Sequence, residues 1–205
     1  MALHDKDIRE PLFDFLETEY GKIRIIEEKT MGRSRADVVM VTEDALFGIE
    51  IKSDADTYTR LSRQVKDYNK FFDYNYVVVG TSHAHHIEEH VPDTWGIITV
   101  EQDENDESAL DFYILRRPER NTKRDMLKKV GLLWRPEMAH ILAAEKLPKY
   151  SGKNKRYITK VIADKIPEEK LDRMISEELF ERDYTVREDL IYRNKALADI
   201  IRIDT

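Results

Sequence analysis

The chain has 205 residues, of which 41% are hydrophobic and 37% charged, and its formal net charge is -7. This composition is typical of a folded globular protein, and no apolar run is long enough to predict a membrane span. Cysteine is absent, which excludes disulfides and thiolate metal sites. The first residues lack the apolar segment of a signal peptide, so we expect a cytoplasmic protein. The negative charge disfavours a protein that coats nucleic acid, but not an enzyme that contacts phosphates locally.

The first quarter of the chain predicts one helix followed by three strands. Apolar residues recur at helical spacing over 5–20, and short apolar runs indicate strands at 23–26, 36–41 and 45–52. A polar stretch at 42–44 predicts a hairpin turn between the last two strands. These two strands should therefore pair in an antiparallel manner.

The middle of the chain alternates between helix and strand. We expect a helix at 58–72, a buried strand at 74–79, a short helix at 83–90, a strand at 95–100 and an edge strand at 112–115. The helix at 58–72 connects two strands by a crossover, which favours parallel pairing between them.

From about residue 121 the pattern is helical throughout, with helices expected at 123–130, 135–146, 155–165 and 168–182. The expected fold class is therefore α/β, with a mixed, helix-flanked sheet in residues 1–120. Residues 121–205 form a helical region that is a candidate for contact with nucleic acid or a protein partner.

Three charged residues interrupt strands that otherwise look buried: Asp37, Glu50 and Lys52. Side chains alternate along a strand, so Glu50 and Lys52 share a face and lie roughly 6.5 Å apart. In a hairpin that turns at 42–44, Asp37 falls opposite them. Burying such charges costs several kcal/mol unless they bind something. Two carboxylates with a lysine suit a Mg²⁺ or Mn²⁺ ion and an attacking water.

These residues resemble the PD-(D/E)xK nuclease superfamily. Asp37 is similar to its first acidic residue, and Glu50-x-Lys52 is similar to its second motif. Gln64 and Tyr68 resemble the Gln-x-x-x-Tyr of many superfamily exonucleases. The likeness covers most of the chain and is greatest to a small branch of largely uncharacterised bacterial and phage proteins.

The resemblance implies a restriction-endonuclease-like fold and a Mg²⁺-dependent deoxyribonuclease, with Mn²⁺ as a substitute. Asp37, Glu50 and the backbone carbonyl of Ile51 would hold the metal, and Lys52 would position the water. Gln64 would orient Lys52 or the scissile phosphate. The superfamily often adds an upstream glutamate, for which the candidates are Glu28 and, behind it, Glu27 and Glu17. Ala36 stands where the superfamily has proline. Many related nucleases dimerise, so a homodimer is a further expectation.

Five basic residues are candidates for contact with DNA: Arg60, Arg63, Lys153, Lys155 and Arg156. The two arginines are expected near Lys52, and the other three lie in a basic interval with interleaved tyrosines. The alternative interpretation of each group is a solvated helix surface.

Two other patterns have competing interpretations. The residues His86 to His90 match the H-x-x-E-H pattern of a zinc protease, but the segment is short and polar. Asp56 or Thr57 is expected to cap the helix at 58–72. The alternative function for the whole chain is a catalytically inactive nuclease-fold module that binds nucleic acid or a protein partner. The sequence leaves open endonuclease versus exonuclease action and the form of the target.

Overall fold

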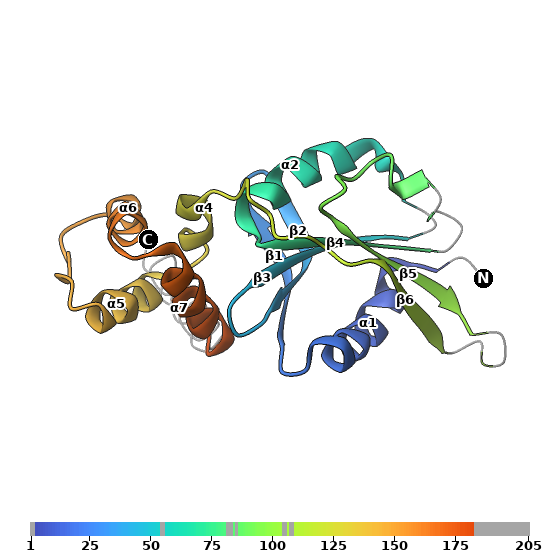
Figure 1. Cartoon of the computed structure of the whole chain (residues 1–205), viewed down its shortest axis with the longest axis horizontal. Coiled ribbons are helices and arrows are strands. Elements are labelled where there is room, and N and C mark those ends of the chain that lie inside the picture. Colours follow the sequence, from blue (N-terminus) through green and yellow to red (C-terminus); the bar gives the residue numbers. More distant parts are fainter. Residues whose placement is uncertain are drawn as a thin grey trace, which may run out of the picture.

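A computed structural model describes residues 3–53, 56–80, 84, 86–103, 106 and 109–182. These residues form a six-stranded sheet with a helix on each face and a group of helices beyond one end (Figure 1). Among the described residues, no helix is long and apolar enough to cross a membrane.

The sheet is mixed, and its strand order follows the chain, β1-β2-β3-β4-β5-β6. The first three strands pair antiparallel, β3 to β5 pair parallel, and β6 pairs antiparallel to β5. This confirms the predicted α/β class and the predicted pairings on both sides of β3. The strands are β1 (Arg24–Met31), β2 (Ser34–Val41), β3 (Leu46–Lys52), β4 (Tyr74–Gly80), β5 (Gly96–Gln102) and β6 (Leu110–Arg116).

The helices lie close to their predicted ranges. They are α1 (Asp5–Tyr20), the 3-10 turn η1 (Tyr58–Arg60), α2 (Leu61–Phe71), α4 (Met126–Val130), α5 (Arg135–Ala144), α6 (Lys155–Lys165) and α7 (Glu168–Phe180). The helix predicted at 83–90 lies partly outside the described residues. Strand β1 is longer than the predicted 23–26, because its polar second half pairs with β2 up to a tight turn at Gly32, whose φ is +58°.

Each face of the sheet is covered by one helix (Figure 1). Helix α1 packs its apolar stripe, Ile8, Leu12 and Leu16, in a cluster with Val38 and Ile49. Helix α2 covers the opposite face with a second cluster, which extends into the C-terminal helices. The core is therefore divided by the sheet, and Glu50 of β3 faces α2, whose Tyr68 donates a hydrogen bond to it.

Gly48 allows β3 to approach α2 closely. A Cβ atom at this position would lie 2.2 Å from the ring of Phe72 and 2.6 Å from the ring of Tyr68. Any side chain here would push the helix away from the strand. The absence of a side chain thus places Tyr68 directly against the middle of β3, next to Glu50.

A buried ionic network attaches the C-terminal helices to the sheet. The Nζ atom of Lys129 donates to Asp73 Oδ2 and to Asp172 Oδ1, at 2.6 Å in both cases. Asp73 also accepts from the backbone N–H of Leu46, at 2.7 Å. Arg124 pairs with both carboxylates. Because Lys129, Asp73 and Asp172 are almost fully buried, each depends on the others to compensate its charge.

Candidate active site

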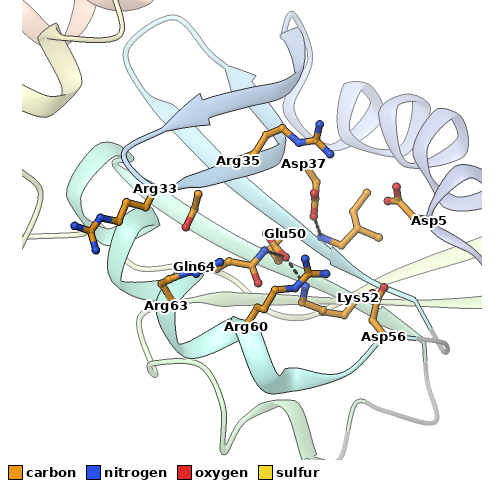
Figure 2. Close-up of a pocket in the computed structure, with 12 residues that line it drawn as sticks. Asp5, Arg33, Arg35, Asp37, Glu50, Lys52, Asp56, Arg60, Arg63 and Gln64 are labelled. Atoms are coloured by element: carbon orange, nitrogen blue, oxygen red, sulfur yellow. Dashed lines mark hydrogen bonds and ion pairs between the residues drawn. The ribbon is translucent and has the colours of Figure 1, made fainter.

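The three predicted charged residues meet at one end of the β2–β3 pair (Figure 2). Val38 pairs with Ile49, so the register places Asp37 beside Glu50. Asp37 Oδ2 accepts a hydrogen bond from the backbone N–H of Ile51 at 2.9 Å. The juxtaposition expected from the hairpin is confirmed, because a two-strand register leaves few alternatives once the turn is known.

Glu50 is fully buried and is held by three donors. Its Oε1 accepts from Lys52 Nζ at 2.5 Å and from Gln64 Nε2, and its Oε2 accepts from the Tyr68 hydroxyl at 2.7 Å. These donors replace the water that a carboxylate loses on burial. Lys52 and Gln64 thus point at the same carboxylate oxygen.

The Tyr68 hydroxyl connects the two acidic residues. Besides its bond to Glu50, it lies 3.2 Å from the carbonyl oxygen of Ile49 and accepts from the backbone N–H of Asp37 at 3.3 Å. Burial, reinforced by the negative charges of Glu50 and Asp37, raises the pKa of Tyr68 well above its usual value. Tyr68 is therefore a neutral hydrogen-bond donor throughout the physiological range.

Asp37 carries an electrostatic cost. Burial, together with the negative charge of the neighbouring Glu50, raises the carboxyl pKa to about 7, although the Ile51 N–H and Lys52 oppose the shift. An ordinary aspartate ionises far below neutral pH. A divalent cation beside Asp37 would favour its charged form and displace the proton.

The raised pKa of Asp37 predicts that the protein without added metal loses stability as the pH rises. Between pH 3.8, the ordinary pKa, and about pH 7, the folded state binds more protons than the unfolded state. The contribution of Asp37 to the free energy of unfolding is therefore fully present at low pH, and it is lost as the pH rises to about 7. Asp37→Asn keeps the acceptor for the Ile51 N–H without a charge. In EDTA at about pH 8 it should be more stable than wild type by roughly 2–4 kcal/mol.

Urea denaturation of both proteins at several pH values measures this difference. The gain should shrink towards about pH 4, where both forms of residue 37 are neutral in the folded state. A wild-type protein that equals the variant at the higher pH would contradict the assigned pKa.

The site opens into a pocket of about 250 Å³. Asp37, Glu50, Lys52 and Gln64 line it together with a residue that the sequence analysis did not select, Asp5 at the start of α1. Figure 2 shows Asp5 on the side of the pocket formed by α1. An acidic residue in the first turn of a helix is common, and its proximity to β3 depends on how α1 packs.

Asp5 presents one carboxylate oxygen that has no hydrogen-bond partner among the described residues. Its Oδ2 accepts from Arg9 Nε at 2.9 Å and Arg9 Nη2 at 2.8 Å, whereas its Oδ1 is buried and unpaired. The side-chain oxygen of Gln64 is likewise buried without a partner. Unpaired oxygens at a pocket lined by carboxylates are the ligands that a hard cation prefers.

Glu28, the predicted upstream ligand, does not line the pocket. The register would place it beside Asp37, but its backbone adopts a left-handed conformation, with φ of +50°. Its side chain is 51% exposed and accepts a hydrogen bond from Arg35 Nη1 at 3.1 Å. Of the other two candidates, Glu27 pairs with Arg9 and Glu17 is exposed on α1. Asp5 and Asp56, rather than Glu28, are therefore the further acidic residues that line the pocket.

Four arginines surround the acidic centre. Arg60 and Arg63, both predicted contacts, line the pocket from η1 and α2. Arg33 and Arg35, which sequence reasoning missed, line it from the β1–β2 turn and the start of β2. The predicted contacts Lys153, Lys155 and Arg156 lie instead in or just before α6, at the other end of the molecule (Figure 1).

The structure disagrees with one minor prediction, the cap of the helix at 58–72, and gives no support to the competing zinc-protease interpretation of residues 86–90. Asp56 does not cap the following helix: its Oδ2 accepts from the backbone and the hydroxyl of Ser53, at 3.0 and 2.8 Å. Thr57 makes no side-chain cap either. His86 is mostly exposed and the ring of His90 packs on Tyr58, with centroids 4.4 Å apart.

In the part of the chain that the structure describes, no three histidine, aspartate or glutamate side chains are grouped so that they could hold a metal ion together. This does not conflict with Mg²⁺, which keeps several waters and needs only one or two protein carboxylates. Asp37, Glu50, Asp5 and Ile51 supply oxygen donors at the pocket, and Asp56 and Gln64 line it as well. The raised pKa of Asp37 and the unpaired Oδ1 of Asp5 are both consistent with the binding of such an ion.

Comparison with known proteins adds one relationship. The family of bacteriophage P4 protein cII matches residues 2–204, nearly the whole chain. No curated protein and no solved structure matches.

Proposed function

The chain belongs to the bacteriophage P4 protein cII family, and we propose that it is a metal-dependent nuclease that hydrolyses DNA phosphodiester bonds. The observation that carries this proposal is the convergence of Asp37, Glu50, Lys52 and Gln64 on one pocket rimmed by arginines. The resemblance to the PD-(D/E)xK superfamily and its restriction-endonuclease-like fold supports the same reading. Phage biology, defence, repair or recombination in the cytoplasm are the settings that it fits.

The acidic residues would hold the ion. Asp37, Glu50 and the carbonyl of Ile51 provide the oxygens, and Asp5 provides a further carboxylate that Arg9 keeps in place. When bound, Mg²⁺ or Mn²⁺ lowers the pKa of a water molecule and stabilises negative charge on the phosphate. The 2.5 Å Lys52–Glu50 pair keeps the ammonium beside the carboxylate, where it can hold and orient the attacking water.

The remaining pocket residues would bind the substrate. Gln64 donates its amide to the same oxygen of Glu50 as Lys52 does, which positions it to orient Lys52 or the scissile phosphate. Arg33, Arg60 and Arg63 are fixed positive charges around the acidic centre. A guanidinium group can donate two parallel hydrogen bonds to the oxygens of one phosphate, so these arginines suit a DNA backbone that enters the pocket.

The alternative is a module of the same fold that binds nucleic acid or a protein partner without cleaving it. The saturation of Glu50 by Lys52, Gln64 and Tyr68 favours this alternative, because metal binding requires these donors to make room. The presence of every charged residue of the motif favours the enzyme.

The test is a cleavage assay of the purified full chain on linear, circular, single-stranded and branched DNA. We expect products in Mg²⁺ or Mn²⁺ on at least one form and none in EDTA. Asp37→Ala should show neither products nor heat of Mn²⁺ binding by calorimetry. DNA binding without products on any form in either metal would instead establish the non-catalytic module.

A further inference from the structure

A second basic feature lies far from the candidate active site, between α4 and α6 (Figure 1). The two helices border a groove of about 710 Å³, almost three times the volume of the acidic pocket. Lys128 lines it from α4, and Arg156 and Lys160 line it from α6. All three residues are exposed, and none forms an ion pair with another described residue.

The charge of this groove is strongly positive in a protein whose net charge is -7. Asp125 is the acidic residue in its lining, and the carboxylate is engaged at the start of α4, where it accepts from the backbone N–H of Leu127 at 2.9 Å. The lining thus carries three positive charges and one negative charge, a balance that attracts a polyanion. Lys170 on α7, by contrast, is paired with Glu145 at 2.6 Å.

The groove also exposes apolar surface among its cations. Leu127 and Tyr157 line it and are 45% and 43% exposed. The Tyr157 ring is held in place by edge contact with Tyr150, with centroids 5.5 Å apart, and by Lys153 Nζ at 5.3 Å from its centroid. An anchored, exposed aromatic ring among cations is what single-stranded nucleic acid binds by stacking.

We propose that this groove binds a single strand of DNA, with its phosphates on Lys128, Arg156 and Lys160 and a base against Tyr157. The choice of DNA as the ligand rests on the proposed function, but the groove itself is independent of the acidic pocket. Lys155, a predicted contact, is not one of the lining residues, because its Nζ donates to the carbonyl of Gly131 at 2.8 Å.

The groove and the pocket lie at opposite ends of β3. Lys52, at one end of the strand, faces the pocket, whereas Leu46, at the other end, bonds to Asp73, which pairs with Lys129 next to Lys128. Seven residues of strand span about 20 Å, so a DNA strand that reaches both places must span more than about 20 Å.

Fluorescence anisotropy with a labelled single-stranded DNA of about 24 nucleotides in EDTA tests this proposal. Replacing both Lys128 and Lys160 with alanine should weaken binding about tenfold and reduce the salt dependence of the affinity by about 1.4 in log–log slope. The matched control is Lys165→Ala, an exposed lysine on the same helix that does not line the groove. It should bind as wild type does.

The double variant removes only exposed side chains, so its circular dichroism should match that of wild type. Unchanged affinity and salt slope in this folded variant would overturn the proposal. The positive groove would then be assigned to the binding of an acidic protein. The measurement contains no metal and no turnover. If the cleavage assay yields no product while the groove variant loses DNA binding, the proposed nuclease activity is wrong and the proposed DNA-binding groove is supported.

Discussion

Lys52→Ala is expected to abolish Mg²⁺-dependent DNA cleavage, with a loss of about 10³-fold or more. Lys52 is almost completely buried at the pocket, and its ammonium lies 2.5 Å from Glu50 Oε1. Without it, no lysine of β3 remains to orient the attacking water. The same loss is expected for Glu50→Gln, which removes a carboxylate that the ion needs.

The measurement is the initial rate of product formation on whichever DNA form wild type cleaves, at saturating Mg²⁺. A matched control is Lys66→Ala, which removes an exposed lysine of α2 that does not line the pocket. Because Lys52→Ala leaves Glu50 buried with one donor fewer, its rate must be compared well below its melting temperature. Cleavage at the wild-type rate by the folded variant would exclude the proposed site.

Lys129→Met is expected to destabilise the protein by about 3–5 kcal/mol. Lys129 is 0% exposed and is shared by Asp73 and Asp172, which are almost equally buried. Methionine fills a similar volume, but it removes the positive charge that pairs with the buried carboxylates of Asp73 and Asp172. Since Asp73 also accepts from Leu46, the effect should reach both the sheet and the C-terminal helices.

Urea denaturation followed by circular dichroism measures this loss. Arg120→Ala is the matched control, because Arg120 also pairs with Asp172, at 2.8 Å, but is 48% exposed. Its loss should cost less than about 1 kcal/mol. If the two variants are equally stable, the ionic network does not hold the helices to the sheet.

The predicted elements were largely correct because they depend on neighbours in the chain. The 3.6-residue spacing of Ile8, Leu12 and Leu16 and the apolar runs of β2 to β5 are local patterns. Strand β1 was underestimated, because its polar second half gains its structure from pairing with β2 rather than from its own pattern.

The sequence by itself determined the centre of the candidate site: a hairpin with a short turn brings Asp37 next to Glu50, and strand alternation puts Lys52 on the same face. Only the tertiary structure decided the rest. Asp5 reaches the pocket because of how α1 packs on the sheet. Glu28 does not line the pocket, and its backbone adopts a left-handed conformation. The groove between α4 and α6 likewise depends on how helices pack, a long-range property that no local pattern encodes.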